Sequence, residues 1–210
     1  MTSGPSDTAD EEYAQRLVAL QRVWWKRLFD AQAPYRWNLA RLRPGFVLEV
    51  GCGIGRNLAN LRGAGVGIDH NAASVTVARQ RGFIAFTPEE FRASGYAQEG
   101  KFDSLLLSHI LEHLRPEEAL VLIRTYLTFL RPGGQLIVET PQERGYRSDA
   151  SHVRFLDFEA VEALYESVGA TVERRSSFPF PRAAGRLFIY NEFVVTGRVM
   201  TSRQERASLQ

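Results

Sequence analysis

The chain has 210 residues, of which 44% are hydrophobic and 24% are charged. This length fits one generous domain and argues against two independent cores, while the hydrophobic content excludes a disordered chain. Lys and Arg number 26 against 24 Asp and Glu, which leaves a net charge of +2, and no apolar run reaches the ~18 residues of a membrane span. We therefore expect neither a nucleic-acid nor a membrane surface.

The first residues of the chain are polar, and they are followed by a helical pattern. Residues 1–10 carry no apolar core, so they are expected to form a disordered arm and not a signal peptide. Over residues 11–33 Leu17, Leu20, Trp24 and Leu28 recur at helical spacing, and Pro34 is expected to end this N-terminal helix. A single cysteine, Cys52, excludes an internal disulfide and fits a cytoplasmic protein.

From Phe46 onward, short apolar runs alternate with helical patterns, which is typical of a parallel sheet. The expected strands are Phe46–Val50, Gly65–Asp69, Phe83–Phe86, Phe102–Leu107 and Gln135–Thr140. The expected helices cover residues 55–62, 72–81, 88–93 and 117–130, with Pro116 at the start of the last one. The fold class predicted here is an α/β, Rossmann-like, doubly wound sheet.

After Thr140 the pattern changes. Residues 141–155 are polar and are expected to form a long loop, followed by a helix from Phe158 to Val168 with Asp157 as its N-cap. Two strands, Thr171–Phe178 and Leu187–Arg198, have no helix between them and should pair antiparallel. Residues 199–210 are expected to be a polar tail.

A glycine-rich turn, Glu49-Val50-Gly51-Cys52-Gly53-Ile54-Gly55, lies between an expected strand and helix. Gly51 and Gly53 permit positive φ and close approach of the backbone to a ligand, and Asp69 ends the next strand, where a carboxylate can accept both hydroxyls of a ribose. A dinucleotide would require G-x-G-x-x-G, but residue 56 is arginine. The acid at Glu49 suits a ligand with a cationic amine better than a pyrophosphate.

Four segments together resemble the successive motifs of class I S-adenosylmethionine-dependent methyltransferases. They are VLEVGCGIGRNL (47–58), VGIDHN (66–71), FDSLLLSHILEHL (102–114) and LRPGGQLIVETPQ (130–142). The resemblance covers residues 34–198 and implies a seven-stranded, mostly parallel sheet with an antiparallel last strand. The segment PYRWN (34–38) is similar to ubiquinone-pathway O-methyltransferases of this family.

The resemblance also implies which residues bind S-adenosyl-L-methionine. It assigns the methionyl part to the glycine turn with Glu49 in support, the ribose to Asp69 with His70 beside it, and the adenine to Phe86–Glu89. Many relatives carry an aspartate after the third strand, where this chain has Thr87. The full expected set is Arg36, Glu49, Gly51, Cys52, Gly53, Gly55, Asp69, His70, Thr87 and Ser108.

Residues His109-Ile110-Leu111-Glu112-His113 read as H-x-x-E-H, a zinc-peptidase pattern. The pattern falls at the end of an expected strand and not within a helix, which argues against a peptidase. Similar ubiquinone-type enzymes carry E-x-x-E-H here with a divalent metal assigned to it. We predict no metal, with His109, Glu112 and His113 as the alternative ligand set.

The expected reaction is in-line transfer of the sulfonium methyl group to oxygen or nitrogen of a small-molecule acceptor. His109 is the first candidate for the base and His152 the second, because histidine accepts protons near neutral pH. His152, Arg144, Tyr146 and Arg154 are candidates for lining the acceptor pocket. The rival interpretations are a non-catalytic cofactor-binding regulator and a nicotinamide-dependent oxidoreductase. We expect a monomer or a homodimer.

Overall fold

A computed structural model describes residues 32–199 of the chain. The expected arm over 1–10, nearly all of the expected helix over 11–33, and all but the first residue of the expected tail over 199–210 lie outside the described residues. Within residues 32–199, no helix combines the length and the apolar character needed to cross a membrane.

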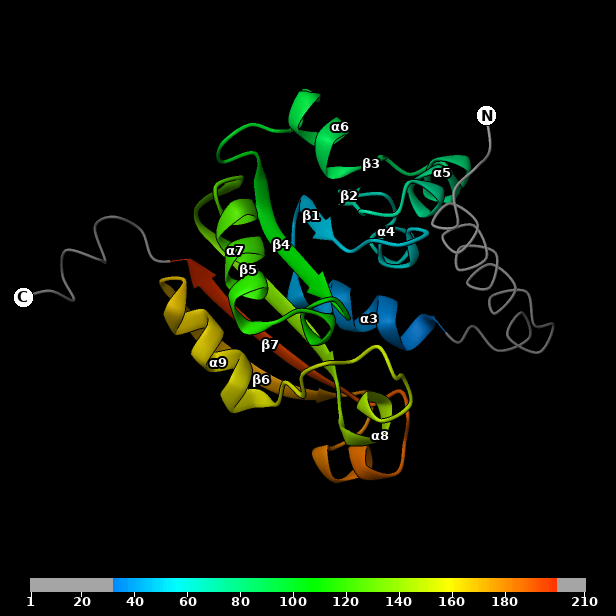
Figure 1. Ribbon diagram of the computed structural model, residues 1–210, viewed down its shortest axis with the longest axis vertical. Coiled ribbons are helices and arrows are strands. Elements are labelled where there is room, and N and C mark those ends of the chain that lie inside the picture. Colours follow the sequence, from blue (N-terminus) through cyan, green and yellow to red (C-terminus); the bar gives the residue numbers. More distant parts are fainter. Residues whose placement is uncertain (1–31, 200–210) are drawn as a thin grey trace, which may run out of the picture. The chain divides into compact units, whose positions relative to one another are not determined.

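Seven strands form one sheet in the order β3-β2-β1-β4-β5-β7-β6 (Figure 1). Strands β2 and β3 pair parallel, as do β4 and β5, whereas β7 runs antiparallel to both β5 and β6. The strands are β1 (Val47–Val50), β2 (Gly65–Ile68), β3 (Ala85–Phe86), β4 (Phe102–Ser108), β5 (Leu130–Pro141), β6 (Ala170–Phe178) and β7 (Glu192–Val199). The predicted α/β fold with a mostly parallel sheet and an antiparallel last strand is confirmed.

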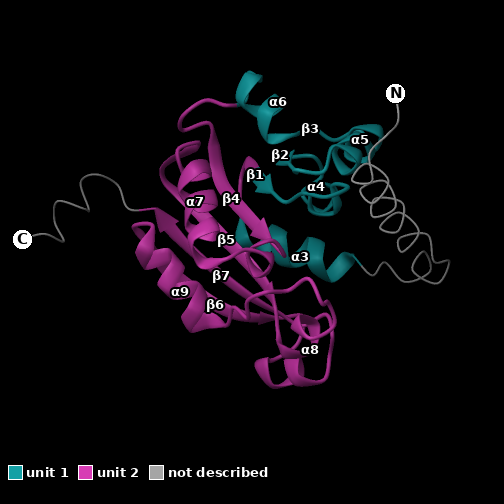
Figure 2. Ribbon diagram, in the orientation of Figure 1, with its two compact units in different colours: residues 1–43, 48–96 teal, residues 44–47, 97–210 magenta. Residues whose placement is uncertain are grey.

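The described residues divide into two compact units (Figure 2): residues 32–43 and 48–96 form the first, and residues 44–47 and 97–199 form the second. In the first unit the helices are α3 (Ala33–Leu42), α4 (Arg56–Asn60), α5 (Ala72–Gln80) and α6 (Pro88–Ala93). Pro34 lies in the first turn of α3, where its missing N–H would be unbonded anyway. The helix that Pro34 was expected to end lies almost wholly outside the described residues, so that expectation stays a prediction.

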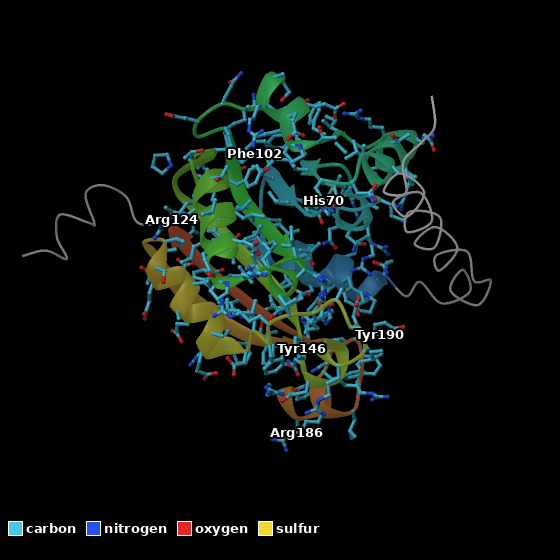
Figure 3. All side chains as sticks on the ribbon, viewed as in Figure 1. His70, Phe102, Arg124, Tyr146, Arg186 and Tyr190 are labelled. Atoms are coloured by element: carbon cyan, nitrogen blue, oxygen red, sulfur yellow. The ribbon has the colours of Figure 1, made fainter. Side chains whose placement is uncertain are left out.

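The second unit contains α7 (Pro116–Leu127), α8 (Glu143–Tyr146) and α9 (Phe158–Ser167), with the 3-10 turns η1 (Leu111–His113) and η2 (Arg182–Arg186). Asp157 caps α9 as predicted, because its side chain accepts a hydrogen bond from the Ala160 N–H. Phe102, which is labelled in Figure 3, is the first residue of β4 and is buried. Its ring stacks on that of Phe46 at a centroid distance of 5.2 Å.

A buried amide network closes the connection from β6 to β7. The Asn191 side chain donates to Gln142 Oε1 at 2.9 Å and accepts from the Phe180 N–H at 2.9 Å. Gln142 in turn donates to the Ser177 hydroxyl and to the Glu192 carbonyl. These bonds explain why the last strand begins at Glu192 and not at Leu187 as expected, since the residues before it form η2 and a bonded loop.

Candidate functional site

The glycine-rich turn of the first unit follows β1 and takes the backbone form that its glycines permit. Gly51, Gly53 and Gly55 have φ values of 80°, 51° and 77°, all in the left-handed region that favours glycine. The N–H groups of Gly51 and Cys52 both donate to the Ile68 carbonyl, which ties the turn to β2. Apart from its two chain neighbours, no described residue has an atom within 4 Å of a Cβ built on Gly53, so this side of the turn has room for a ligand.

Two buried carboxylates flank this turn. The Asp69 carboxylate, at the end of β2, accepts hydrogen bonds from the Gly53 N–H at 2.7 Å and the Asn71 N–H at 2.9 Å. Glu49 in β1 is also buried and accepts a hydrogen bond from the Asn57 side chain at 2.9 Å. The structure thus brings Glu49 and Asp69 to the same turn, as a site for the amine and ribose of a nucleoside ligand requires.

Cys52 contributes to the core and not to the open face of the turn. Its side chain is buried with Leu58, Val75 and Ala78, and burial, with the nearby charges of Glu49 and Asp69, raises the pKa of the thiol well above its ordinary value. Any contact of Cys52 with a ligand would therefore come from its backbone.

The other cofactor residues predicted in this unit lie in varied settings. His70 follows Asp69 with its side chain 89% exposed, at 3.7 Å from that carboxylate. Thr87 caps α6 through a capping box with Glu90, in which the Thr87 hydroxyl oxygen accepts a hydrogen bond from the Glu90 N–H. Arg36 is half-buried in α3. The predicted roles of these residues stay predictions.

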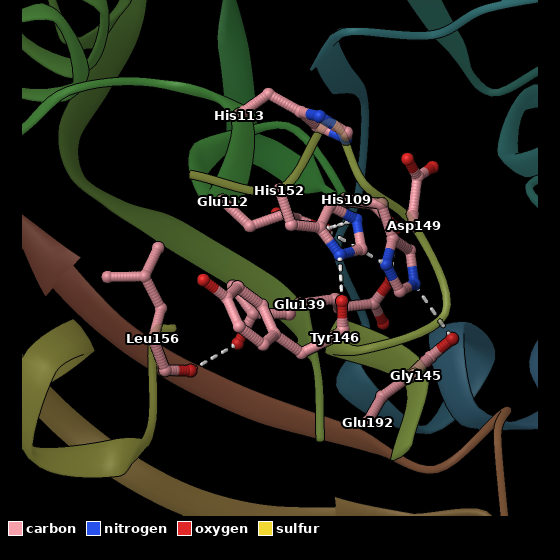
Figure 4. Close-up of polar contacts among 12 residues, drawn as sticks. His109, Glu112, His113, Glu139, Gly145, Tyr146, Asp149, His152, Leu156 and Glu192 are labelled. Carbon is pink, nitrogen blue, oxygen red and sulfur yellow. Dashed lines mark hydrogen bonds and ion pairs between the residues drawn. The ribbon is translucent and has the colours of Figure 1, made fainter. Parts of the chain in front are cut away.

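The second unit carries a cluster of histidines and carboxylates at the carboxyl ends of β4 and β5 (Figure 4). His109 has a φ of 55°, a left-handed conformation that directs its ring toward two acids. Its Nε2 lies 2.8 Å from Glu192 Oε1, and its Nδ1 lies 3.3 Å from Glu112 Oε1. Both ring nitrogens therefore face carboxylates.

This geometry favours the protonated form of the His109 ring. Burial opposes the charge, but the carboxylates of Glu192 and Glu112 outweigh burial and raise the pKa of His109 to about 10. The direction of this shift favours the protonated ring at neutral pH, with one nitrogen hydrogen-bonded to Glu192 and the other at ion-pair distance from Glu112. A general base needs a lone pair free to accept a proton, and the carboxylates of Glu192 and Glu112 favour the protonated ring. The assignment of His109 as the base stays a prediction.

Glu112, His113 and His152 lie beside this ion pair. Glu112 has a fully buried side chain, and the loop residues Val153 and Arg154 both donate their N–H groups to its backbone carbonyl. The His152 Nδ1 lies 2.8 Å from the Tyr146 carbonyl, and the two rings stack at 5.4 Å. The structure therefore places His152 beside Glu112 and His113, two of the three residues named above as the alternative set of metal ligands.

The remaining predicted residues of this unit divide by exposure. Ser108 is buried and donates its hydroxyl proton to Glu139 Oε2 at 2.8 Å, so it has no further proton to give a cofactor. Arg144 is exposed, and Arg154 is half-buried. Sequence reasoning missed Glu192, whose only signal is an acid at the start of an apolar strand.

Comparisons with known proteins identify the family of this chain. The family model described as "Methyltransferase domain" matches residues 21–172. A ubiquinone biosynthesis O-methyltransferase of Xanthomonas campestris pv. campestris is 29% identical over 160 residues, which cover 67% of this chain and 66% of the relative. A tRNA U34 carboxymethyltransferase of Pseudoalteromonas translucida is 29% identical over 163 residues, or 65% of this chain and 49% of the relative.

The fold is also found among solved structures. A putative methyltransferase from Haloferax volcanii, solved in complex with the Trm112 methyltransferase activator, matches with a TM-score of 0.66 at 16% identity. The match covers 91% of this chain and 97% of that one. The chain spans about two thirds of the length of the Xanthomonas relative and about half that of the tRNA-modifying one. With its matched model and its seven-stranded sheet, the chain belongs to the class I methyltransferase family, whose members use S-adenosyl-L-methionine as the methyl donor.

Proposed function

We propose that this protein transfers a methyl group from S-adenosyl-L-methionine to an oxygen or nitrogen atom of a small-molecule acceptor in the cytoplasm. In this reaction a lone pair of the acceptor forms the new bond to the methyl carbon while the carbon–sulfur bond breaks. The electron pair of that bond stays on sulfur, which leaves S-adenosylhomocysteine, and the acceptor loses a proton. Holding acceptor and methyl group in line supplies most of the rate.

The observation that carries the cofactor assignment is the open face of the glycine turn. Gly53 combines a left-handed backbone with empty space where a Cβ would stand, and the buried Asp69 carboxylate approaches its N–H at 2.7 Å. A nucleoside with a cationic amino-acid tail matches two buried carboxylates, Glu49 and Asp69, better than a pyrophosphate does. This charge balance favours S-adenosylmethionine over the nicotinamide cofactor of the rival interpretation.

The acceptor assignment rests on the second unit. The carboxyl ends of β4 and β5 present the His109 cation with Glu112 and Glu192, next to the Tyr146–His152 stack. Such a mixture of charges and aromatic rings suits a small polar or aromatic molecule. One relative is a tRNA U34 carboxymethyltransferase, so the net charge of +2 on this chain is not sufficient reason to exclude a nucleic-acid acceptor. We therefore include tRNA among the acceptors tested.

The cofactor assignment is tested by calorimetric titration with S-adenosylhomocysteine, with NADH titrated in parallel. Gly53→Ala places a methyl group in the open space and should weaken binding about tenfold or more. Gly82→Ala is the matched control, because Gly82 also has a left-handed φ, 85°, and nothing within 4 Å of its Cβ position. Equal affinity of the two variants, or tighter binding of NADH, would refute the assignment.

The acceptor is then sought with cofactor labelled in the methyl group. The protein is offered pools of phenols and hydroxylated rings, of amines, and of bulk tRNA. Label found in a small molecule supports the proposal, and label found only in tRNA refutes it. Tight cofactor binding without transfer to any pool would favour the non-catalytic regulator.

A further inference from the structure

The side chains of Glu112, His113 and His152 form a group whose chemistry is not explained by the ion pair of His109. One ligand atom from each of the three lies within 4.8 Å of the others. Figure 4 shows the three side chains converging from η1 and from the loop that follows α8. We propose that these residues bind one divalent first-row transition metal ion, with His109 outside the set of ligands.

The Glu112 carboxylate is the first observation that points to a ligand. It is 1% exposed, and among the described residues neither of its oxygens accepts a hydrogen bond of normal geometry. The groups at ion-pair distance are His109 Nδ1 at 3.3 Å and His152 Nε2 at 4.0 Å. A buried carboxylate that lacks hydrogen bonds is costly, and a metal ion is the partner that would compensate it best.

The His152 ring is set up as a metal ligand. Its Nδ1 lies 2.8 Å from the Tyr146 carbonyl, which can only accept, so Nδ1 carries the proton of the neutral ring. The lone pair is then on Nε2, the atom that faces Glu112. Metal-bound histidines typically donate their second nitrogen to a carbonyl in this way, which fixes both the tautomer and the ring orientation.

The same argument holds for His113. Its Nδ1 lies 3.3 Å from the Ser151 carbonyl and 3.2 Å from the Ser151 hydroxyl oxygen. That hydroxyl donates its one proton to Asp149 at 2.6 Å, so it can only accept from the ring. His113 therefore also carries its proton on Nδ1 and leaves a lone pair on Nε2.

Two imidazole nitrogens and one carboxylate are a common ligand set for zinc and for non-haem iron. With metal–ligand bonds of about 2.0–2.2 Å, a tetrahedral ion holds its ligand atoms about 3.4 Å from one another. The separations of up to 4.8 Å in this structure would therefore have to shorten by about 1 Å to close the site. His109 is excluded, since both of its nitrogens point at carboxylates. Its contact with Glu112 would hold that carboxylate in place for the metal.

This ligand set differs from the one that the family resemblance implies, because His152 takes the place of residue 109. It also replaces the prediction that His152 is a base, since the Nε2 lone pair would be bound to the metal. The inference does not depend on methyl transfer, because it concerns binding of the ion alone.

The experiment is titration of metal-stripped, full-length protein, prepared without a polyhistidine tag, with Co²⁺ and with Zn²⁺. We expect one equivalent of Co²⁺ to give visible d–d absorption bands that Zn²⁺ displaces. His113→Gln and His152→Asn should each weaken binding about 100-fold or more. His109→Asn should weaken binding about tenfold, and less than either ligand substitution, as an indirect effect through Glu112.

Two results would overturn the proposal. One is the absence of stoichiometric Co²⁺ and Zn²⁺ binding to the unmodified protein. The other is binding that survives His152→Asn but is lost in His109→Asn, which would restore the ligand set implied by the resemblance. The His113 side chain is at the surface, so its replacement should not impair folding, and far-UV circular dichroism of every variant checks this.

Discussion

The ion pair between His109 and Glu192 should make the stability of this protein depend on pH in a specific direction. The substitution that tests it is His109→Asn, because asparagine carries no charge and tolerates the left-handed φ of 55° found at this position. A larger or branched residue would add backbone strain and obscure the electrostatic effect.

The magnitude follows from the pKa of the ring. Burial lowers this pKa, but Glu192 and Glu112 outweigh burial and raise it from the ordinary value of 6.5 to about 10. A difference of one unit in pKa is worth about 1.4 kcal/mol. The pair therefore contributes at most about 5 kcal/mol, and we expect about 2–3 kcal/mol because the His109 ring is 29% exposed to water. The folded state holds the proton more tightly than the unfolded chain. The contribution is thus complete below pH 6.5 and is lost as the pH rises through 10.

The assay is urea unfolding followed by far-UV circular dichroism at pH 6, 8 and 10.5, with a chelator present. The difference in unfolding free energy between wild type and His109→Asn should be largest at pH 6 and close to zero at pH 10.5. His70→Asn is the control, because its exposed ring should give a small difference at every pH. A His109 difference that is constant from pH 6 to 10.5, or that grows with pH, would refute the reasoning.

Three further predictions concern packing. Gly67→Ala would place a Cβ 2.6 Å from Cys52 Sγ, so it should lower the free energy of unfolding measured in urea by about 1–3 kcal/mol. Gly95→Ala is the control, because its Cβ position has open space and the same measurement should change little. The Cys52 thiol should react with Ellman's reagent at pH 8 far more slowly in native than in urea-unfolded protein; equal rates would contradict its burial. Asn191→Ala removes the centre of the buried amide network and should lower the melting temperature by an amount equivalent to about 1–3 kcal/mol, and an unchanged melting temperature would show that the network adds no stability.

Much of the fold could be predicted because its signals are local. The alternation of apolar runs with helical patterns predicts the parallel strands, and Asp157 and Gly169 mark the two ends of α9. The start of β5 was missed, since Arg131–Gly134 has the composition of a turn but belongs to the strand. An ion pair between Arg131 and Asp103 at 2.7 Å, together with a register shift in β4, accommodates these residues.

The two halves of the candidate site differ in how far the sequence predicts them. The glycine turn is encoded within a few residues, so its positive φ angles follow from Gly51, Gly53 and Gly55 alone. The charge of His109 depends on Glu192, 83 positions away, and no local pattern connects the two. The proton on the His152 Nδ1 likewise depends on the Tyr146 carbonyl, a contact that only the folded loop provides.

The position of Glu192 has a consequence for the order in which the protein matures. Glu192 is the first residue of β7, the last strand within residues 32–199, and β7 fits between β5 and β6. Until that strand has docked, His109 lacks the carboxylate 2.8 Å from its Nε2 and titrates closer to an ordinary histidine. A chain in which β7 has not yet docked therefore lacks the charge of the finished site. The protonation of this one ring reports whether the last strand has been inserted.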